Sequence, residues 1–162
     1  HGDIAVLRFA GGLPSGYGPA QVLLDASSLV KGARITLAGY GTTRVAAEEK
    51  MLNLRKVDVS IADPLFAKTE VLLDQTSGRG ACHGDSGGPA YLVASNGQTY
   101  LWGVTSRTAN DPKDTCQAYS VYTNLLPYAS WIKQTISSLM TTPSANTKKP
   151  HKEPAPRPSK AS

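Results

Sequence analysis

Residues 81–89 read Ala-Cys-His-Gly-Asp-Ser-Gly-Gly-Pro and place one serine, Ser86, inside a glycine-rich turn with apolar segments on both sides. A serine hydroxyl is a weak nucleophile, so a catalytic serine needs a base to take its proton and donors to hold the oxyanion. Because glycine has no Cβ and reaches positive φ, Gly84, Gly87 and Gly88 would let a substrate carbonyl approach the backbone N–H groups of Gly84 and Ser86. The simpler alternative is a tight turn between two strands that carries a surface serine.

The composition predicts one domain and a tail. A chain of 162 residues that is 40% hydrophobic is long enough for one well-buried core. Most of the formal charge of +5 lies in residues 141–162, which hold five basic residues and one acid. This segment is rich in proline, serine and lysine, so we expect a disordered basic tail that could hold weakly to an anionic surface. The nearly neutral body argues against nucleic-acid binding, and no apolar run is long enough to span a membrane.

Short apolar or alternating segments with β-branched residues predict an antiparallel barrel or sandwich. The expected strands are residues 3–9, 22–24, 33–41, 52–61, 71–73, 90–94, 99–104 and 119–122. Residues 10–19 hold four glycines and two prolines and read as a linker. Asn96-Gly97 is a strong hairpin signal, and residues 127–136 change to helical spacing.

Several of these segments together resemble the trypsin and chymotrypsin family of serine peptidases. Residues 84–89, GDSGGP, resemble the signature of the family's active site, and residues 3–9, DIAVLRF, resemble the segment that begins with its triad aspartate. Residues 38–41, Ala-Gly-Tyr-Gly, resemble a Gly-Trp-Gly segment of the family, with tyrosine in place of tryptophan. Tyr122-Thr123-Asn124 before a Trp-Ile helix resembles the family's carboxyl end, so the resemblance covers about residues 3–138.

The fold that this resemblance implies is all-β. Residues 1–19 would be the last strand of a first barrel and the linker between barrels. Residues 20–140 would be the second barrel of a two-barrel chymotrypsin-like fold with a C-terminal helix, and residues 141–162 the tail. Cys82 and Cys116 are expected to form the family's disulfide beside the nucleophile. By restricting the unfolded chain, this bridge would stabilise the folded state by roughly 3.5 kcal/mol.

The implied function is that of a serine endopeptidase. Ser86 would be the nucleophile, Asp3 would orient the catalytic histidine, and the N–H groups of Gly84 and Ser86 would form the oxyanion hole. Taken alone, Asp3 could equally be a solvated carboxylate near a chain end. Asp85 would pair with an amino terminus freed by proteolysis and so shape the oxyanion hole.

The general base is not evident in the sequence. The family's triad runs histidine, aspartate, serine along the chain, so the histidine should precede Asp3, in a first barrel that this chain lacks. Of the three histidines, His151 lies in the predicted tail, and His83 matches a position that borders the substrate cleft. His1 shares a strand face with Asp3, but it would have to place its ring from a frayed terminus. We therefore expect residues 1–162 alone to have negligible peptidase activity.

The resemblance also predicts the specificity pocket. Gly80 stands where a carboxylate would select lysine or arginine, so an uncharged substrate side chain is expected. Arg107 stands where the family usually has tryptophan, and its charge could instead favour an acidic substrate residue. The positions that match the pocket lining are Gly80, Ala81, His83, Ser106, Arg107, Thr108 and Ser120.

The alternative function is a catalytically inactive protease-like binding protein. No metal-ligand cluster or cofactor motif is recognisable, so no cofactor is expected. Polypeptide substrates, protein inhibitors of proteases and the missing N-terminal barrel are the expected partners. The resemblance places the protein outside the cell or in the cell envelope.

Overall fold

The computed structural model describes residues 2–42, 53–113 and 115–141. Its strands are β1 (Gln21–Val22), β2 (Arg34–Gly39), β3 (Arg55–Ala67), β4 (Glu70–Asp74), β5 (Pro89–Val93), β6 (Thr99–Ala109) and β7 (Tyr119–Asn124). Two 3₁₀ turns, Ala26–Ser28 and Leu126–Tyr128, and the helix α1 (Ala129–Thr141) complete the regular elements.

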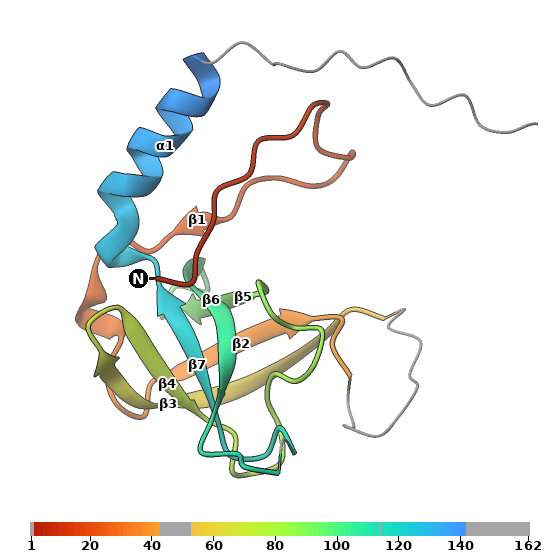
Figure 1. Ribbon diagram of the computed structural model, residues 1–162, viewed down its shortest axis with the longest axis vertical. Coiled ribbons are helices and arrows are strands. Elements are labelled where there is room, and N and C mark those ends of the chain that lie inside the picture. Colours follow the sequence, from red (N-terminus) through yellow and green to blue (C-terminus); the bar gives the residue numbers. More distant parts are fainter. Residues whose placement is uncertain (1, 43–52, 114, 142–162) are drawn as a thin grey trace, which may run out of the picture.

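Strands β2 to β7 form a closed antiparallel barrel (Figure 1). The barrel closes because β6 pairs with β5 through its first half and with β7 through its second half. Closure leaves no long free edge, which is one way in which antiparallel sheets avoid edge-to-edge association. The all-β barrel with a C-terminal helix is thus confirmed, and β1 adds only a two-residue parallel pairing on β6.

Apolar side chains that alternate along the strands fill the barrel. Trp102 on β6 and Tyr122 on β7 are almost fully buried, and their ring centroids lie 6.0 Å apart. Further core side chains come from β2, β3, β4 and β5, namely Ile35, Leu37, Val59, Ile61, Val71, Leu73, Ala90 and Leu92. By contrast, α1 buries none of its residues and extends away from the barrel (Figure 1).

Two strands are longer than predicted. The strand predicted at residues 52–61 corresponds to β3, which continues to Ala67 and turns directly into β4. Similarly, β6 continues past residue 104 to Ala109. Both extensions contain polar or exposed residues, so they lack the apolar alternation by which a strand is recognised. The Asn96-Gly97 hairpin is confirmed, with Gly97 at a φ of 80°.

The strand predicted for residues 3–9 was wrong. The segment has no regular secondary structure, and β6 and β7 contact it without forming a ladder. A strand persists only where its backbone groups find a neighbouring strand, and no described strand offers that pairing. Leu7 and Phe9 consequently remain 86% and 68% exposed.

Part of what the sequence predicted lies outside the described residues. This applies to the tail beyond residue 141, to His1 and to residues 43–52, which include the first residue of the strand expected at residues 52–61. In the described ranges, no helix is both long enough and apolar enough to cross a bilayer.

Candidate active site

The loop that carries Ser86 joins β4 to β5 and is folded by its own backbone bonds. The Asp85 N–H donates to the Cys82 carbonyl at 3.0 Å, and the Gly88 N–H donates to the Asp85 carbonyl at 2.8 Å. Gly84 and Gly87 have φ values of 92° and 80°, a region that glycine reaches without steric cost. Ser86 itself is exposed at the tip of this turn.

Backbone bonds also attach this loop to β6. The Gly87 N–H donates to the carbonyl of Thr105, and the Thr105 N–H donates to the carbonyl of Gly88, each at 2.9 Å. The Thr105 hydroxyl adds a third bond to the Gly88 carbonyl at 3.1 Å. These bonds fix the backbone on the carboxyl side of Ser86.

The Asp85 side chain turns away from solvent and is enclosed by backbone. Its Oδ1 accepts from the Gly41 N–H and its Oδ2 from the Cys82 N–H, both at 2.9 Å. A Cβ built on Gly39 or Gly41 would lie 2.0 or 2.4 Å from the carboxylate, so the end of β2 and the residues after it can approach Asp85 this closely only with glycine at these positions.

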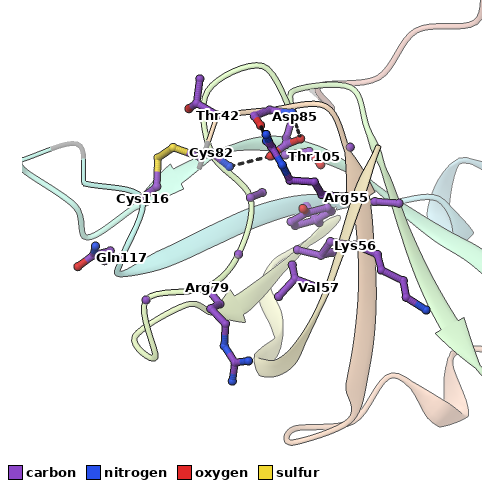
Figure 2. A pocket seen from close by; sticks show the side chains of 18 of the residues that line it. Thr42, Arg55, Lys56, Val57, Arg79, Cys82, Asp85, Thr105, Cys116 and Gln117 are labelled. Atoms are coloured by element: carbon purple, nitrogen blue, oxygen red, sulfur yellow. Dashed lines mark hydrogen bonds between the residues drawn. A yellow bond between two sulfur atoms is a disulfide. The ribbon is translucent and has the colours of Figure 1, made fainter. Parts of the chain in front are cut away.

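A cavity of about 290 Å³ opens beside Asp85 (Figure 2). Its lining includes Gly41, Arg55, Gly80 and Ala81. Gly80 and Ala81 are thus the two predicted pocket residues that line it. His83, Ser106, Arg107, Thr108 and Ser120 are not among its lining residues.

The disulfide between Cys82 and Cys116 is present, with the two Cα atoms 5.3 Å apart. It joins the Ser86 loop to the segment that precedes β7. His83 lies close to both sulfurs in a grouping of metal-binding residue types. Because both sulfurs are consumed in the bridge, this group has no thiolate to offer a metal.

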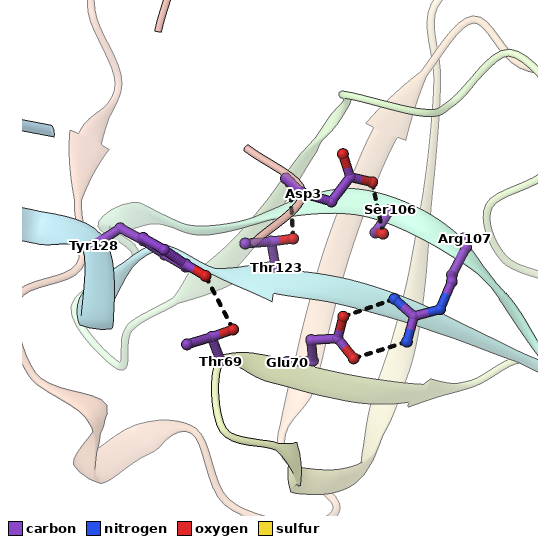
Figure 3. Close-up of polar contacts among 7 residues, drawn as sticks. All are labelled: Asp3, Thr69, Glu70, Ser106, Arg107, Thr123 and Tyr128. Carbon is purple, nitrogen blue, oxygen red and sulfur yellow. Dashed lines mark hydrogen bonds and ion pairs between the residues drawn. The ribbon is translucent and has the colours of Figure 1, made fainter. Parts of the chain in front are cut away.

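Asp3 is held against the barrel although its segment forms no strand (Figure 3). The Ser106 hydroxyl donates to Asp3 Oδ2 at 2.8 Å, and the hydroxyl of the buried Thr123 donates to the Asp3 carbonyl at 2.9 Å. Since Thr105 binds the Ser86 loop, two consecutive residues of β6 bring Asp3 and that loop to the same strand.

Arg107 is paired within the chain. Its guanidinium makes a bidentate ion pair with Glu70, at 2.7 and 2.8 Å (Figure 3). The hydrogen bonds from Arg107 lower the pKa of Glu70, and Glu70 in turn raises the pKa of Arg107. Half of the Arg107 side chain remains exposed, but its charge is matched by a carboxylate.

The family model described as Trypsin matches residues 1–132 of this sequence. The chain belongs to the trypsin family. This trypsin-family chain is 31% identical over 160 residues to an inactive CLIP domain-containing serine protease of Aedes aegypti, a match that covers 83% of the chain and 32% of the relative. It is 33% identical over 154 residues to a CLIP domain-containing serine protease of Anopheles gambiae, covering 84% of the chain and 41% of the relative.

A trypsin and a solved structure are also similar to this trypsin-family chain. It is 28% identical over 148 residues to trypsin alpha-3 of Lucilia cuprina, covering 85% of each. A solved structure of a mutant of human heparin binding protein matches with a TM-score of 0.64 at 20% identity, over 83% of this chain and 56% of that one, and shows a shared fold. The chain spans less than half of the length of the two CLIP domain-containing relatives.

Sequence reasoning missed Gln75, which follows β4 and is fully buried. Its amide donates to the carbonyls of Ala81 and Cys116 at 3.0 Å each and accepts from the Ala81 N–H at 2.7 Å. A Cβ on Gly80 would lie 2.1 Å from this amide, so the missing side chain at Gly80 makes room for Gln75. A polar residue directly after an apolar strand is a weak sequence signal, because most such residues are solvated.

Ser106 and Ser120, two of the predicted pocket residues, lie in different surroundings in the structure. Ser106 was expected at the pocket wall, and its hydroxyl binds Asp3. Ser120 is 1% exposed, lies opposite Thr108 in the β6–β7 register, and its hydroxyl has no hydrogen-bond partner within the described part of the chain. His83 is exposed, and its carbonyl accepts from the Thr42 N–H at 2.9 Å.

Proposed function

We propose that this chain is the nucleophile-bearing barrel of a secreted serine endopeptidase, and that an N-terminal barrel supplies the histidine. The observation that carries the proposal is the attachment of Asp3 and the Ser86 loop to consecutive residues of β6, Ser106 and Thr105. A triad requires its nucleophile and its carboxylate to converge on one base. Membership of the trypsin family supports the same assignment.

In the proposed reaction, Ser86 Oγ attacks the scissile carbonyl carbon as the histidine takes its proton. The electrons of the carbonyl move to its oxygen, and the N–H groups of Gly84 and Ser86 stabilise the oxyanion. The tetrahedral intermediate collapses to an acyl-enzyme, and the leaving amine takes the proton from the imidazolium. Water then attacks the acyl-enzyme through the same steps and releases the carboxylic acid product. Asp3 holds the imidazole in the required tautomer.

The proposed substrates are polypeptides with an uncharged side chain at the cleaved residue. Gly80 brings no charge to the pocket, and its neighbour Gln75 is a neutral amide. The ion pair with Glu70 matches the charge of Arg107, which argues against a strong preference for acidic residues. Beside Gly80 and Gln75, a substrate cation would meet no carboxylate of these two residues to compensate its desolvation.

We also propose that Asp85 links activation to the oxyanion hole. The cavity beside its carboxylate has room for the first residues of an amino terminus released by proteolysis. An ammonium there would add a third, charged donor to the two N–H groups that Asp85 already accepts.

The alternative, a protease-like binding protein, is favoured by one observation. A relative that is 31% identical to this chain is described as inactive. The test is labelling of the intact native protein with a fluorophosphonate, next to the variant Ser86→Ala. Labelling that is lost in the variant supports the peptidase. If the intact wild-type protein is not labelled although circular dichroism shows that it is folded, the peptidase proposal is refuted and the binding protein remains.

A further inference from the structure

Two peptide groups connect the guanidinium of Arg55 to the backbone of the Ser86 loop. Arg55 Nη1 donates to the Gly41 carbonyl at 2.8 Å. The N–H of that same peptide group belongs to Thr42, and it donates to the His83 carbonyl at 2.9 Å. The N–H of this second peptide group belongs to Gly84. A chain of hydrogen bonds therefore begins at a cation and ends at an N–H group beside Ser86.

The geometry of the peptide groups gives this chain a direction. In a trans peptide group the C=O and the N–H point in opposite directions, so the bond that Thr42 makes to the His83 carbonyl also sets the direction of the Gly84 N–H. Gly84 has a φ of 92°, and because glycine restricts its own backbone little, the bond from Thr42 to the His83 carbonyl is what holds this peptide in its orientation.

The same arrangement raises the donor strength of the last N–H. A hydrogen bond from a guanidinium is stronger than one between neutral groups. Hydrogen bonds in series polarise one another, by about 10–30% per bond. The contact of Arg55 with Gly41 is partly buried, so water screens it incompletely. The positive end of the chain of dipoles lies at the Gly84 N–H.

Strand pairing places Arg55 at this point. It is the first residue of β3 and lies opposite Gly39 in the register with β2. Its side chain reaches toward Asp85 and Thr42 at the side of the cavity (Figure 2). Arg55 and Asp85 therefore hold the Gly41 residue from two sides, one at its carbonyl and one at its N–H.

We propose that Arg55 is a positioning residue for catalysis at Ser86, acting through the 41–42 and 83–84 peptide groups to orient and polarise the Gly84 N–H. This role rests on the proposed function, in which that N–H binds the oxyanion. In this role Arg55 acts through the backbone and not through contact with the substrate. Its removal should therefore weaken binding of the tetrahedral intermediate and leave binding of the substrate unchanged.

The test uses the intact protein with the variants Arg55→Met, which removes the cation, and Arg55→Lys, which keeps a charged donor. Lys68→Met is the control, because Lys68 is an exposed cation in the turn after β3, lies outside the cavity and makes none of the bonds of this chain. The measurements are kcat and KM on a neutral peptide amide, the inhibition constant of a peptide aldehyde, which forms a tetrahedral adduct, and hydrogen exchange of the Thr42 amide in ¹⁵N-threonine-labelled protein.

Arg55→Met should lower kcat about tenfold, less than the 10²–10³-fold loss typical of removing an oxyanion donor itself. KM should stay within twofold, the aldehyde should bind about tenfold more weakly, and the Thr42 amide should exchange faster. Arg55→Lys should recover most of each change, and Lys68→Met should resemble the wild type.

Two results would overturn the role of Arg55 while the peptidase stands: an active wild type with unchanged kcat in Arg55→Met, or a lower kcat without faster Thr42 exchange. A wild type that hydrolyses nothing and resists the fluorophosphonate would instead refute the proposed function, and with it the catalytic use of these bonds. Measurement of the wild type thus separates the two failures.

Discussion

The two carboxylates that serve Ser86 in the proposed mechanism are held in opposite ways. Asp85 stands next to Ser86 in the chain, and two backbone N–H groups bind its carboxylate inside a wrap of glycines. Asp3 is exposed, belongs to a segment without regular structure, and is held at the barrel by the side chains of Ser106 and Thr123. The first carboxylate is part of the architecture of its loop, and the second is bound to the barrel by one side-chain hydroxyl while another binds its backbone carbonyl.

The segment that carries Asp3 exposes apolar side chains that a partner domain would cover. Leu7 and Phe9 follow Asp3 and lie largely exposed, whereas the apolar side chains near Asp85 are buried. Arg8 is attached to the far end of α1, where its guanidinium donates to the Leu139 carbonyl. In the proposed two-barrel protein, the first barrel would cover Leu7 and Phe9 and hold Asp3 against its histidine.

The largest expected effect is that of Asp3→Asn in the intact protein. The amide would favour the wrong tautomer of the histidine, so kcat should fall about 10⁴-fold. Because Asp3 is exposed, the free energy of unfolding should change by less than about 0.5 kcal/mol. Kinetics on a peptide amide and urea denaturation measure the two quantities. A loss of stability larger than about 1 kcal/mol would show that Asp3, like Asp85, is needed for the folded structure.

Asp85→Asn should have a smaller effect on turnover and a larger effect on stability. An asparagine can accept only one of the two N–H groups of Gly41 and Cys82 with its oxygen, and leaves the other against its own NH₂ group. The free energy of unfolding should fall by about 1–3 kcal/mol, and kcat by roughly 10²-fold, with KM for an uncharged substrate near the wild-type value.

The control for Asp85→Asn is Asp63→Asn, since Asp63 is an exposed carboxylate that accepts one backbone bond, from the Leu65 N–H. Urea denaturation and the same kinetic assay apply to both variants. If the free energy of unfolding falls equally in the two variants, the enclosure of Asp85 adds no stability, and Asp85 does not differ from Asp3 in this respect.

The smallest expected effect concerns the ion pair of Glu70 and Arg107. The pKa of Glu70 is lower in the folded protein than in the unfolded chain, so the pair contributes its full stability above the unfolded pKa, near 4.3. That contribution is lost as the pH falls through the lower, folded pKa. Because Arg107 is half exposed, the contribution should be below about 1 kcal/mol.

A double-mutant cycle with Glu70→Gln and Arg107→Met, measured by urea denaturation at pH 7 and at pH 3, checks this expectation. The coupling energy should be present at pH 7 and smaller at pH 3. Equal coupling at both values would mean that the two side chains stabilise the barrel by packing alone.

Much of the barrel could be predicted because its signals are local. The segments at residues 33–41, 71–73, 90–94 and 119–122 alternate or are apolar over a strand length, and each became a strand. The strand at residues 3–9 was wrong for the opposite reason. Its apolar residues satisfy the local pattern, but a strand also needs a partner, and partnership is a property of the assembled sheet.

The sequence by itself determined the chemistry available near Ser86: the nucleophile, the glycines that shape its turn, Asp85, and the pair of cysteines that the family resemblance joined correctly. These residues lie close together in the chain or carry a recognisable pattern, so their relation is visible without coordinates.

Only the tertiary structure decided how distant residues meet. Glu70 and Arg107 lie on β4 and β6, which flank β7 and are therefore about 9.5 Å apart. Glu70 lies opposite Thr123 and Arg107 opposite Val121, so two long side chains are needed to bridge the gap. The attachment of Asp3 to Ser106 and of Arg55 to Gly41 depends likewise on strand register and on closure of the barrel. Turns and the apolar pattern specify the register of neighbouring strands, but which distant side chains meet across the barrel becomes visible only once all the strands are assembled.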